Sequence, residues 1–97
     1  MIIIHDIFVC KPGNASKLAK KFKEAMVGNK ELQCIMTDMS GQYNRVIMVS
    51  QYESLTAWEK SWDQWKNPTE EMKKMDEAMA GYQEMYLTGS REIYQVA

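Results

Sequence analysis

The chain has 97 residues and a formal net charge of −1, with 45% hydrophobic and 26% charged residues. A chain of this length predicts a single domain, residues 1–97, with a small core. The balanced charge gives no basic field for nucleic-acid phosphates or an anionic membrane surface, so neither is an expected partner. Nine methionines and three tryptophans are many for this length, and such soft and aromatic side chains suit a pocket or a dimer seam.

The start of the chain and its cysteines bear on location. Residues 1–6 lack the basic start and long apolar core of a signal peptide, and no window approaches the roughly 20 apolar residues of a membrane span. Cytoplasmic residence is therefore expected. Cys10 and Cys34 both lie in apolar, strand-like runs, which predicts reduced, buried thiols rather than a disulfide or a reactive site.

The first elements are a strand and a helix. A strand-like run covers residues 2–10, and the turn chemistry of Lys11-Pro12-Gly13 then leads to Asn14 as a helix cap. Apolar residues at helical spacing predict a helix over 14–27, ended by Gly28 and Asn29: Ala15, Leu18, Ala19, Phe22 and Met26. The lysines between them are interpreted as a solvated face.

Two strand-like runs follow, at residues 31–39 and 45–52. The short polar connector at residues 40–44 predicts a hairpin, which makes these strands antiparallel neighbours. The run at 45–49 is almost continuously apolar, as expected of a strand covered on both faces of its sheet.

The stretch from 54 to 85 is helix-rich. Ser54 is a predicted cap, and one narrow helical face follows it: Leu55, Trp58, Trp62 and Trp65. The region splits near Asn67-Pro68, where Asn67 as cap, Pro68 at the first helical position and Glu70 in a capping box predict a new helix. A methionine stripe continues on that helix: Met72, Met75 and Met79, with Tyr82 after them. A last strand is predicted at 91–96.

The order of these elements, βαββαβ, predicts an α+β, ferredoxin-like domain with a four-stranded antiparallel sheet and both helical regions on one face. The other sheet face then needs a cover that the chain does not provide. A second copy of the protein is the expected partner, with a homodimer formed through the sheet face. The tryptophan and methionine stripes either cover the sheet as solid core or line a ligand pocket between sheet and helices.

Several kinds of site are excluded by residue type. One histidine and two distant cysteines are too few for a zinc site, and no metal is expected. No glycine-rich loop suits a phosphate, and no serine or cysteine stands in a nucleophile motif. RNA-recognition domains share the element order, but residues 44–49 lack the aromatic platform of their third strand. Arg45, Arg91, Glu53 and Glu92 flank strand ends and are interpreted as structural ion-pair residues.

Four segments together resemble the dimeric α/β-barrel superfamily, near its NIPSNAP-like and antibiotic-biosynthesis-monooxygenase-like branches. They are Lys11-Pro12-Gly13, Gly41-Gln42-Tyr43-Asn44-Arg45, Tyr52-Glu53-Ser54-Leu55-Thr56-Ala57-Trp58-Glu59 and Gly89-Ser90-Arg91-Glu92-Ile93-Tyr94. The resemblance implies a ferredoxin-like protomer that pairs sheet to sheet with its twin to form a dimeric α/β barrel. It also implies that any small-molecule cavity lies between the sheet and the helices of each protomer.

The resemblance leaves the activity open between two hypotheses. Haem-degrading relatives use a histidine from the helical region, whereas His5 lies in the first strand, so no haem or other cofactor is expected. The first hypothesis is a homodimeric domain that binds a small apolar or aromatic molecule. The alternative is a cofactor-independent, monooxygenase-like enzyme acting on a phenolic or polyketide-like substrate, with His5 as the catalytic base. The candidate ligand-binding residues are Trp58, Trp62, Tyr52, Met75, Met79 and Tyr94.

Overall fold

The structure, a computed structural model, describes residues 1–40 and 43–97, apart from the side chain of Trp65. In chain order its elements are β1 (Ile2–Cys10), α1 (Ala15–Ala25), β2 (Leu32–Thr37), β3 (Arg45–Tyr52), α2 (Leu55–Asp63), η1 (Gln64–Lys66), α3 (Glu70–Ala78), η2 (Tyr82–Glu84) and β4 (Tyr86–Gln95). The predicted βαββαβ order and α+β class are confirmed. The predicted split of the second helical region is also present, between η1 and α3.

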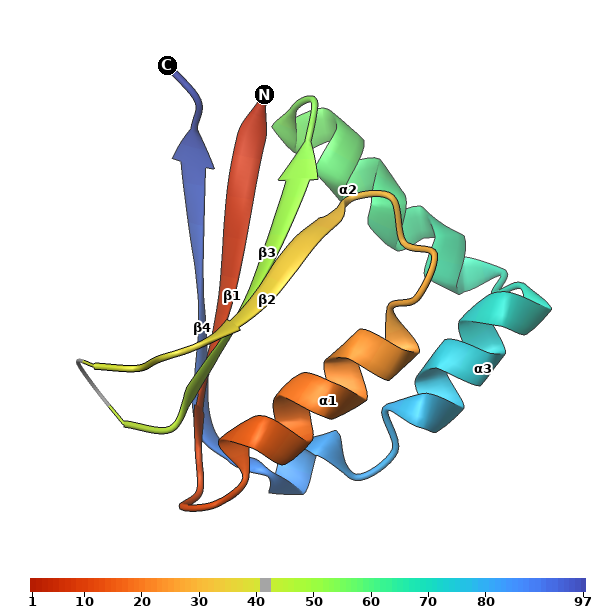
Figure 1. Ribbon diagram of the computed structural model, residues 1–97. Coiled ribbons are helices and arrows are strands. Elements are labelled where there is room, and N and C mark those ends of the chain that lie inside the picture. Colours follow the sequence, from red (N-terminus) through yellow and green to blue (C-terminus); the bar gives the residue numbers. More distant parts are fainter. Residues whose placement is uncertain (41–42) are drawn as a thin grey trace.

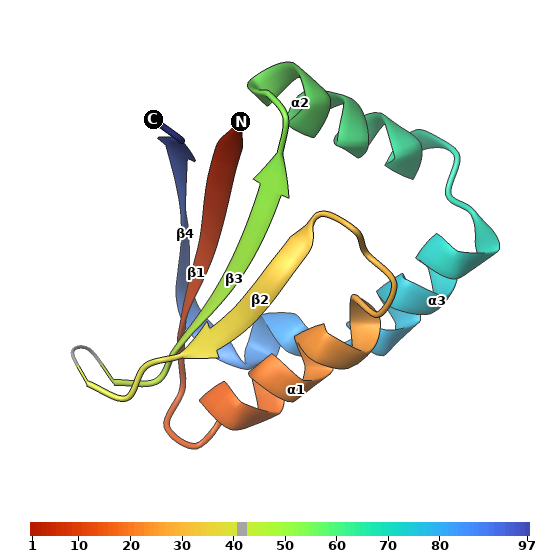
Figure 2. The same ribbon diagram turned by 45° about the horizontal axis from the view of Figure 1, so that its top comes forward.

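The strands form one antiparallel sheet in the order β2-β3-β1-β4. β1 is therefore a central strand, bonded to β3 on one side and to β4 on the other. Figures 1 and 2 show all three α-helices on the same side of this sheet, with α2 leaving the end of β3. The described helices thus leave the second face of the sheet uncovered, as the element order predicts.

The alternation of side chains along β1 assigns each residue to one of these two faces. Ile4 and Cys10 are buried against the helices, so the residues at even positions point that way. The odd positions point to the uncovered face. The cross-strand register extends that assignment to the other strands, and we call the resulting surface the open face: Ile3, His5, Ile7, Val9, Cys34, Met36, Arg45, Ile47, Val49, Gln51, Thr88, Ser90, Glu92 and Tyr94.

The core lies where α1 crosses the sheet. Leu18 and Phe22 of α1 are buried together with Val46 of β3 and Cys10 of β1. The Phe8 and Phe22 rings pack with centroids 5.0 Å apart, a distance at which aromatic rings attract one another beyond simple burial. The helical spacing of the apolar residues therefore predicted the inward side of α1 correctly.

The predicted helix caps have different outcomes. Ser54 caps α2, because its Oγ accepts the Ala57 N–H at 3.1 Å. Asn14 occupies the cap position of α1 but its side chain makes no capping hydrogen bond. The prediction of Asn67 as the cap of the next helix is wrong: α3 begins at Glu70, after Thr69, whose Oγ1 accepts the Met72 N–H at 3.2 Å. Thr69 has extended backbone angles, which cannot continue a helix begun at residue 68.

Two further expectations need correction. The last strand begins at Tyr86 rather than residue 91. It pairs with β1 over the full length of that strand, from Ile2 opposite Gln95 to Cys10 opposite Tyr86. Cys10 is buried as predicted, but Cys34 is exposed, since it points to the open face. Part of the predicted hairpin connector, residues 41 and 42, lies outside the described residues. In the described part of the chain, no helix has the length and apolar character needed to cross a membrane.

Candidate functional site

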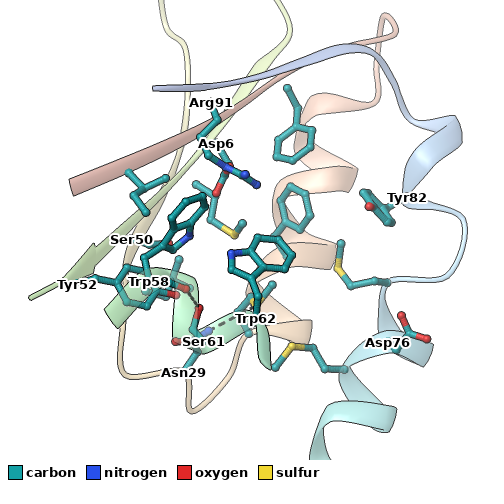
Figure 3. Close-up of a pocket in the computed structure, with 18 residues that line it drawn as sticks. Asp6, Asn29, Ser50, Tyr52, Trp58, Ser61, Trp62, Asp76, Tyr82 and Arg91 are labelled. Atoms are coloured by element: carbon teal, nitrogen blue, oxygen red, sulfur yellow. Dashed lines mark hydrogen bonds and ion pairs between the residues drawn. The ribbon is translucent and has the colours of Figure 1, made fainter. Parts of the chain in front are cut away.

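A cavity of about 340 Å³ lies between the sheet and the three α-helices. Its wall combines helix-facing residues of the sheet with inward residues of the helices, as Figure 3 shows: Ile4, Asp6, Phe8, Phe22, Met26, Asn29, Leu32, Met48, Ser50, Tyr52, Trp58, Ser61, Trp62, Met75, Asp76, Met79, Tyr82 and Arg91. Small-molecule sites in proteins occupy cavities of this size, roughly 300–1,000 Å³, with mostly apolar walls and a few polar groups.

The two tryptophans of α2 form one side of the cavity. Trp58 and Trp62 are four residues apart, so they lie one above the other on the same helical face. Their rings meet edge to face, with centroids 6.1 Å apart and an interplanar angle of 87°. The Ser54 cap fixes the start of this helix directly after β3, which holds both rings over the sheet.

Asp6 and Arg91 form an ion pair at the sheet side of the cavity. The antiparallel register places Asp6 of β1 directly opposite Arg91 of β4 on the helix-facing side. Arg91 Nε donates to Asp6 Oδ1 at 2.6 Å, and the Asp6 side chain is only 16% exposed. Figure 3 shows the two side chains together at one end of the cavity. A carboxylate in these partly buried surroundings needs such a partner.

The same arginine also contacts both tryptophans. The centre of the Arg91 guanidinium lies 5.2 Å from the Trp58 ring centroid and 5.5 Å from that of Trp62. A cation within about 6 Å of an aromatic face is attracted by the ring quadrupole. Arg91 therefore links β4, β1 and α2, and it makes the polar end of the cavity continuous with its aromatic wall.

The remaining wall is soft and mostly apolar. Met48 lies on β3, and Met75 and Met79 lie in and at the end of α3. Methionine side chains are flexible and polarisable, so they adapt to ligands of different outline. A few polar side chains are scattered among them, of which Ser50 and Asp76 come from opposite walls of the cavity. This composition suits a molecule that is largely apolar with a small number of polar atoms.

Five of the seven residues singled out from the sequence line this cavity: Tyr52, Trp58, Trp62, Met75 and Met79. The structure does not bring the other two to it. His5 and Tyr94 lie on the open face, separated from the cavity by the sheet itself. Their rings meet edge to face with centroids 5.3 Å apart.

Tyr94 has a second partner on the open face. Its hydroxyl donates to Glu92 Oε1 at 2.9 Å. That hydrogen bond, followed by partial burial and the negative charge of Glu92, raises the pKa of Tyr94 above its ordinary value. These three side chains therefore form a polar and aromatic group of their own, away from the cavity.

Sequence reasoning missed the Asp6–Arg91 pair as part of the site. The sequence pattern predicts Arg91 only as a structural ion-pair residue at a strand end, and it indicates no role for Asp6 in a site. One signal was available: Asp6 interrupts an otherwise apolar run at a helix-facing position, where an unpaired carboxylate would be costly. To identify Arg91 as the partner of Asp6, the residue-by-residue pairing of β1 with β4 must be known. The order of the elements does not determine that pairing to within one residue.

The described residues contain no group of three or more histidine, cysteine or acidic side chains that could hold a metal ion. Among the described residues that line the cavity, Asp6 and Arg91 form an ion pair with each other. The residues that line the cavity offer apolar contacts, hydrogen-bonding groups and two carboxylates, those of Asp6 and Asp76.

No protein-family model matches this chain, and no curated protein matches it in sequence. Its fold does resemble solved structures. A NIPSNAP family protein from Agrobacterium tumefaciens superposes with a TM-score of 0.80 at 13% identity, over 99% of this chain and 92% of that one. A NIPSNAP domain protein from Burkholderia xenovorans gives a TM-score of 0.77 at 11% identity, over 100% and 95%.

An antibiotic-biosynthesis-monooxygenase-like protein from Deinococcus radiodurans superposes less closely, with a TM-score of 0.60 at 13% identity, over 100% of this chain and 93% of that one. These neighbours confirm the ferredoxin-like fold and the resemblance to both groups of proteins. At such low identity the likeness concerns the fold alone and carries no activity.

Proposed function

We propose that this protein binds a small apolar or aromatic molecule in the cavity between its sheet and helices, as one half of a homodimer. The observation that carries the proposal is the cavity itself, with its two indole rings and methionine wall. A dry, apolar cavity of about 150 Å³ already holds benzene. A cavity of about 340 Å³ therefore has room for a molecule of two or more rings.

Native mass spectrometry of the protein as purified tests this proposal. We expect an added mass on the wild-type protein, either retained from the host or after incubation with a two-ring aromatic compound. Met48→Trp fills the cavity from β3 and should abolish the added mass. Met39→Trp adds the same ring at a fully exposed position and should leave binding intact. Equal binding by both variants would contradict the cavity as the site.

The homodimer is supported by the open face. Aliphatic side chains of the two central strands gather there, among them Ile3, Ile7 and Val9 of β1 and Ile47 of β3. A contiguous apolar surface of this kind on a small protein marks an interaction site. A second copy, paired face to face, would cover it and leave both cavities accessible, because they lie on the far side of each sheet.

Light scattering behind a sizing column tests the dimer. We expect about twice the chain mass of 11.3 kDa at micromolar concentration. Ile47→Glu places a charge at the centre of the open face and should yield a folded monomer. Val27→Glu introduces the same charge at a site that is 81% exposed, away from the sheet, and should remain dimeric. A wild-type protein that elutes as a monomer would overturn this part of the proposal.

A second candidate function is favoured by Asp6. A cofactor-independent, monooxygenase-like enzyme needs a base that deprotonates a phenolic or polyketide-like substrate inside an apolar site. Asp6 presents a carboxylate to the aromatic cavity, whereas His5, the base suggested by the sequence, faces away from it. Oxygen uptake with simple quinols tests this function: Asp6→Asn should abolish it and His5→Ala should retain it. The opposite pattern would return the role to His5 and move the site to the open face.

We also propose that the protein resides in the cytoplasm. Both cysteines are free thiols, and Cys34 is exposed, which suits a reducing compartment. Fractionation of cells that express the tagged protein at native level tests this: we expect the tag in the cytosolic fraction, and recovery from an oxidising compartment would contradict it.

A further inference from the structure

The charge balance at the polar end of the cavity indicates what kind of ligand atom it receives. Arg91 carries one positive charge, and the Asp6 carboxylate at 2.6 Å already compensates it. A second carboxylate, Asp76, also lines the cavity. An anionic ligand would therefore bring a negative charge next to an arginine that is already neutralised and into the same cavity as another acidic group, and these like charges repel each other.

The hydrogen-bonding capacity of Arg91 is nevertheless only partly used. Its Nε donates to Asp6, and the hydrogen bonds among the described residues give the two Nη groups no acceptor. A guanidinium has five N–H donors in a fixed plane, so four of them remain for water or a ligand. An uncharged ligand that offers an acceptor oxygen would use these donors at no cost in charge.

The surroundings of Arg91 determine the shape of the group that approaches it. The Trp58 and Trp62 ring centroids lie 5.2 Å and 5.5 Å from the centre of the guanidinium, and the two rings stand at 87° to each other, so they form a corner beside it. A flat molecule stacked on the face of one of these rings, beside the guanidinium, would direct its edge toward Arg91. The acceptor therefore belongs on the edge of an aromatic system, as the oxygen of an aryl ketone or a quinone does.

We propose that the Asp6–Arg91 pair is the polar subsite for an uncharged, flat aromatic ligand, in which the Arg91 Nη groups donate to a carbonyl oxygen on the edge of the ring system. This inference rests on the proposed small-molecule binding and specifies its chemical class. Asp6 acts as the positioning residue: it removes the net charge of Arg91 and fixes the plane of the guanidinium.

Calorimetric titration with three matched probes tests the proposal on the full-length protein. The probes share one naphthalene ring system: 2-acetylnaphthalene carries an uncharged carbonyl, 2-ethylnaphthalene carries none, and 2-naphthoate carries a carboxylate. A hydrogen bond to a charged donor favours the ketone over the hydrocarbon by on the order of tenfold. We expect the ketone to bind most tightly of the three.

Variants of the two arginines of the chain, Arg45 and Arg91, provide a matched pair. Arg91→Lys keeps the charge beside Asp6 but loses the planar donors, so it should remove the preference for the ketone and change hydrocarbon binding by less than about threefold. Arg45 forms a similar ion pair with Asp38 but does not line the cavity, and Arg45→Lys should leave all three affinities unchanged. Arg91→Gln, which retains planar donors without charge, should restore part of the preference.

The outcomes separate the two proposals. Equal binding of ketone and hydrocarbon, or an Arg91→Lys variant that keeps the ketone preference, would overturn the subsite while leaving the binding cavity in place. Tighter binding of 2-naphthoate would overturn the uncharged class. If none of the probes binds to the wild-type protein, both proposals fail together.

Discussion

The Asp38 carboxylate holds Arg45 at two points. Oδ1 accepts the backbone N–H of Arg45 at 3.1 Å, and Oδ2 accepts its Nε at 3.0 Å. Asp38 follows β2 and Arg45 opens β3, so these two bonds close the base of the β2–β3 connection. Burial alone would raise the pKa of Asp38, but the two hydrogen bonds and the positive charge of Arg45 outweigh it and lower the pKa below the ordinary 3.8.

Asp38→Asn should therefore reduce stability in a pH-dependent way. Because the folded pKa is lower than the unfolded one, the stabilisation by Asp38 is complete above the ordinary value of 3.8 and is lost as the pH falls through the folded value. Urea unfolding at pH 7 should show a lower free energy for the variant, and the difference from wild type should shrink below pH 3.8. The control is Asp63→Asn, which removes an exposed ion pair with Lys66 and should have little effect at either pH.

Phe22→Ala should be the most damaging single truncation in α1. Phe22 is 2% exposed and packs against Phe8 and Tyr82, so its removal leaves a void that the rigid sheet cannot fill. Truncations of this kind cost about 3–5 kcal/mol. Tyr43→Ala at a site 86% exposed is the control and should cost within about 0.5 kcal/mol. Urea unfolding followed by circular dichroism measures both, and similar losses would contradict the core described above.

Truncation of the different helix-capping side chains should reduce the free energy of unfolding by different amounts, measured by the same urea unfolding. Thr69→Ala and Ser54→Ala each remove a hydroxyl that accepts a helix N–H, and each should cost about 1 kcal/mol. Asn14→Ala should cost less than half of that, because its side chain makes no capping bond. Asn67→Ala is the matched control for α3, and a loss equal to that of Thr69→Ala would show that the helix begins earlier in solution.

The two thiols should differ in reactivity. Burial, and secondarily the charge of Asp38, raises the pKa of Cys10, which keeps it protonated and slow to react. Cys34 is exposed on the open face and should react quickly with a disulfide reagent in dilute protein. Its reaction should slow as the protein concentration rises and the open face becomes covered. A rate independent of concentration would contradict a dimer through this face, and a fast thiol in Cys34→Ser would contradict the burial of Cys10.

The architecture was predictable from the sequence because element order and apolar spacing are local properties. The tryptophan and methionine stripes predicted which sides of α2 and α3 face inward, and four of their residues do meet at the cavity: Trp58, Trp62, Met75 and Met79. Helix starts were less predictable. Asn67 and Thr69 both have capping side chains, and the local sequence does not decide between them.

The polar part of the site was not predictable to the same degree. His5 and Asp6 are adjacent in a strand, so one of them points to the cavity and the other away from it. Which of the two points to the cavity depends on whether the even-numbered or the odd-numbered residues of β1 face the helices. Ile4 and Phe8 line the cavity, so the even-numbered residues face the helices, but this is known only from the fold. Arg91 depends on a contact between strands at opposite ends of the sequence, and no local pattern encodes it.

The position of β1 between β3 and β4 affects how the chain folds during synthesis. β4 is made last, yet it pairs with β1 from Ile2 to Cys10, and the backbone N–H of Val96 donates to the carbonyl of Met1 at 3.0 Å. Until β4 emerges from the ribosome, β1 has one bare edge and the Asp6 carboxylate has no arginine beside it. Unpaired strand edges promote wrong pairing between chains. The edge of β1 that faces β4 is therefore protected against pairing with other chains only after β4 has been made.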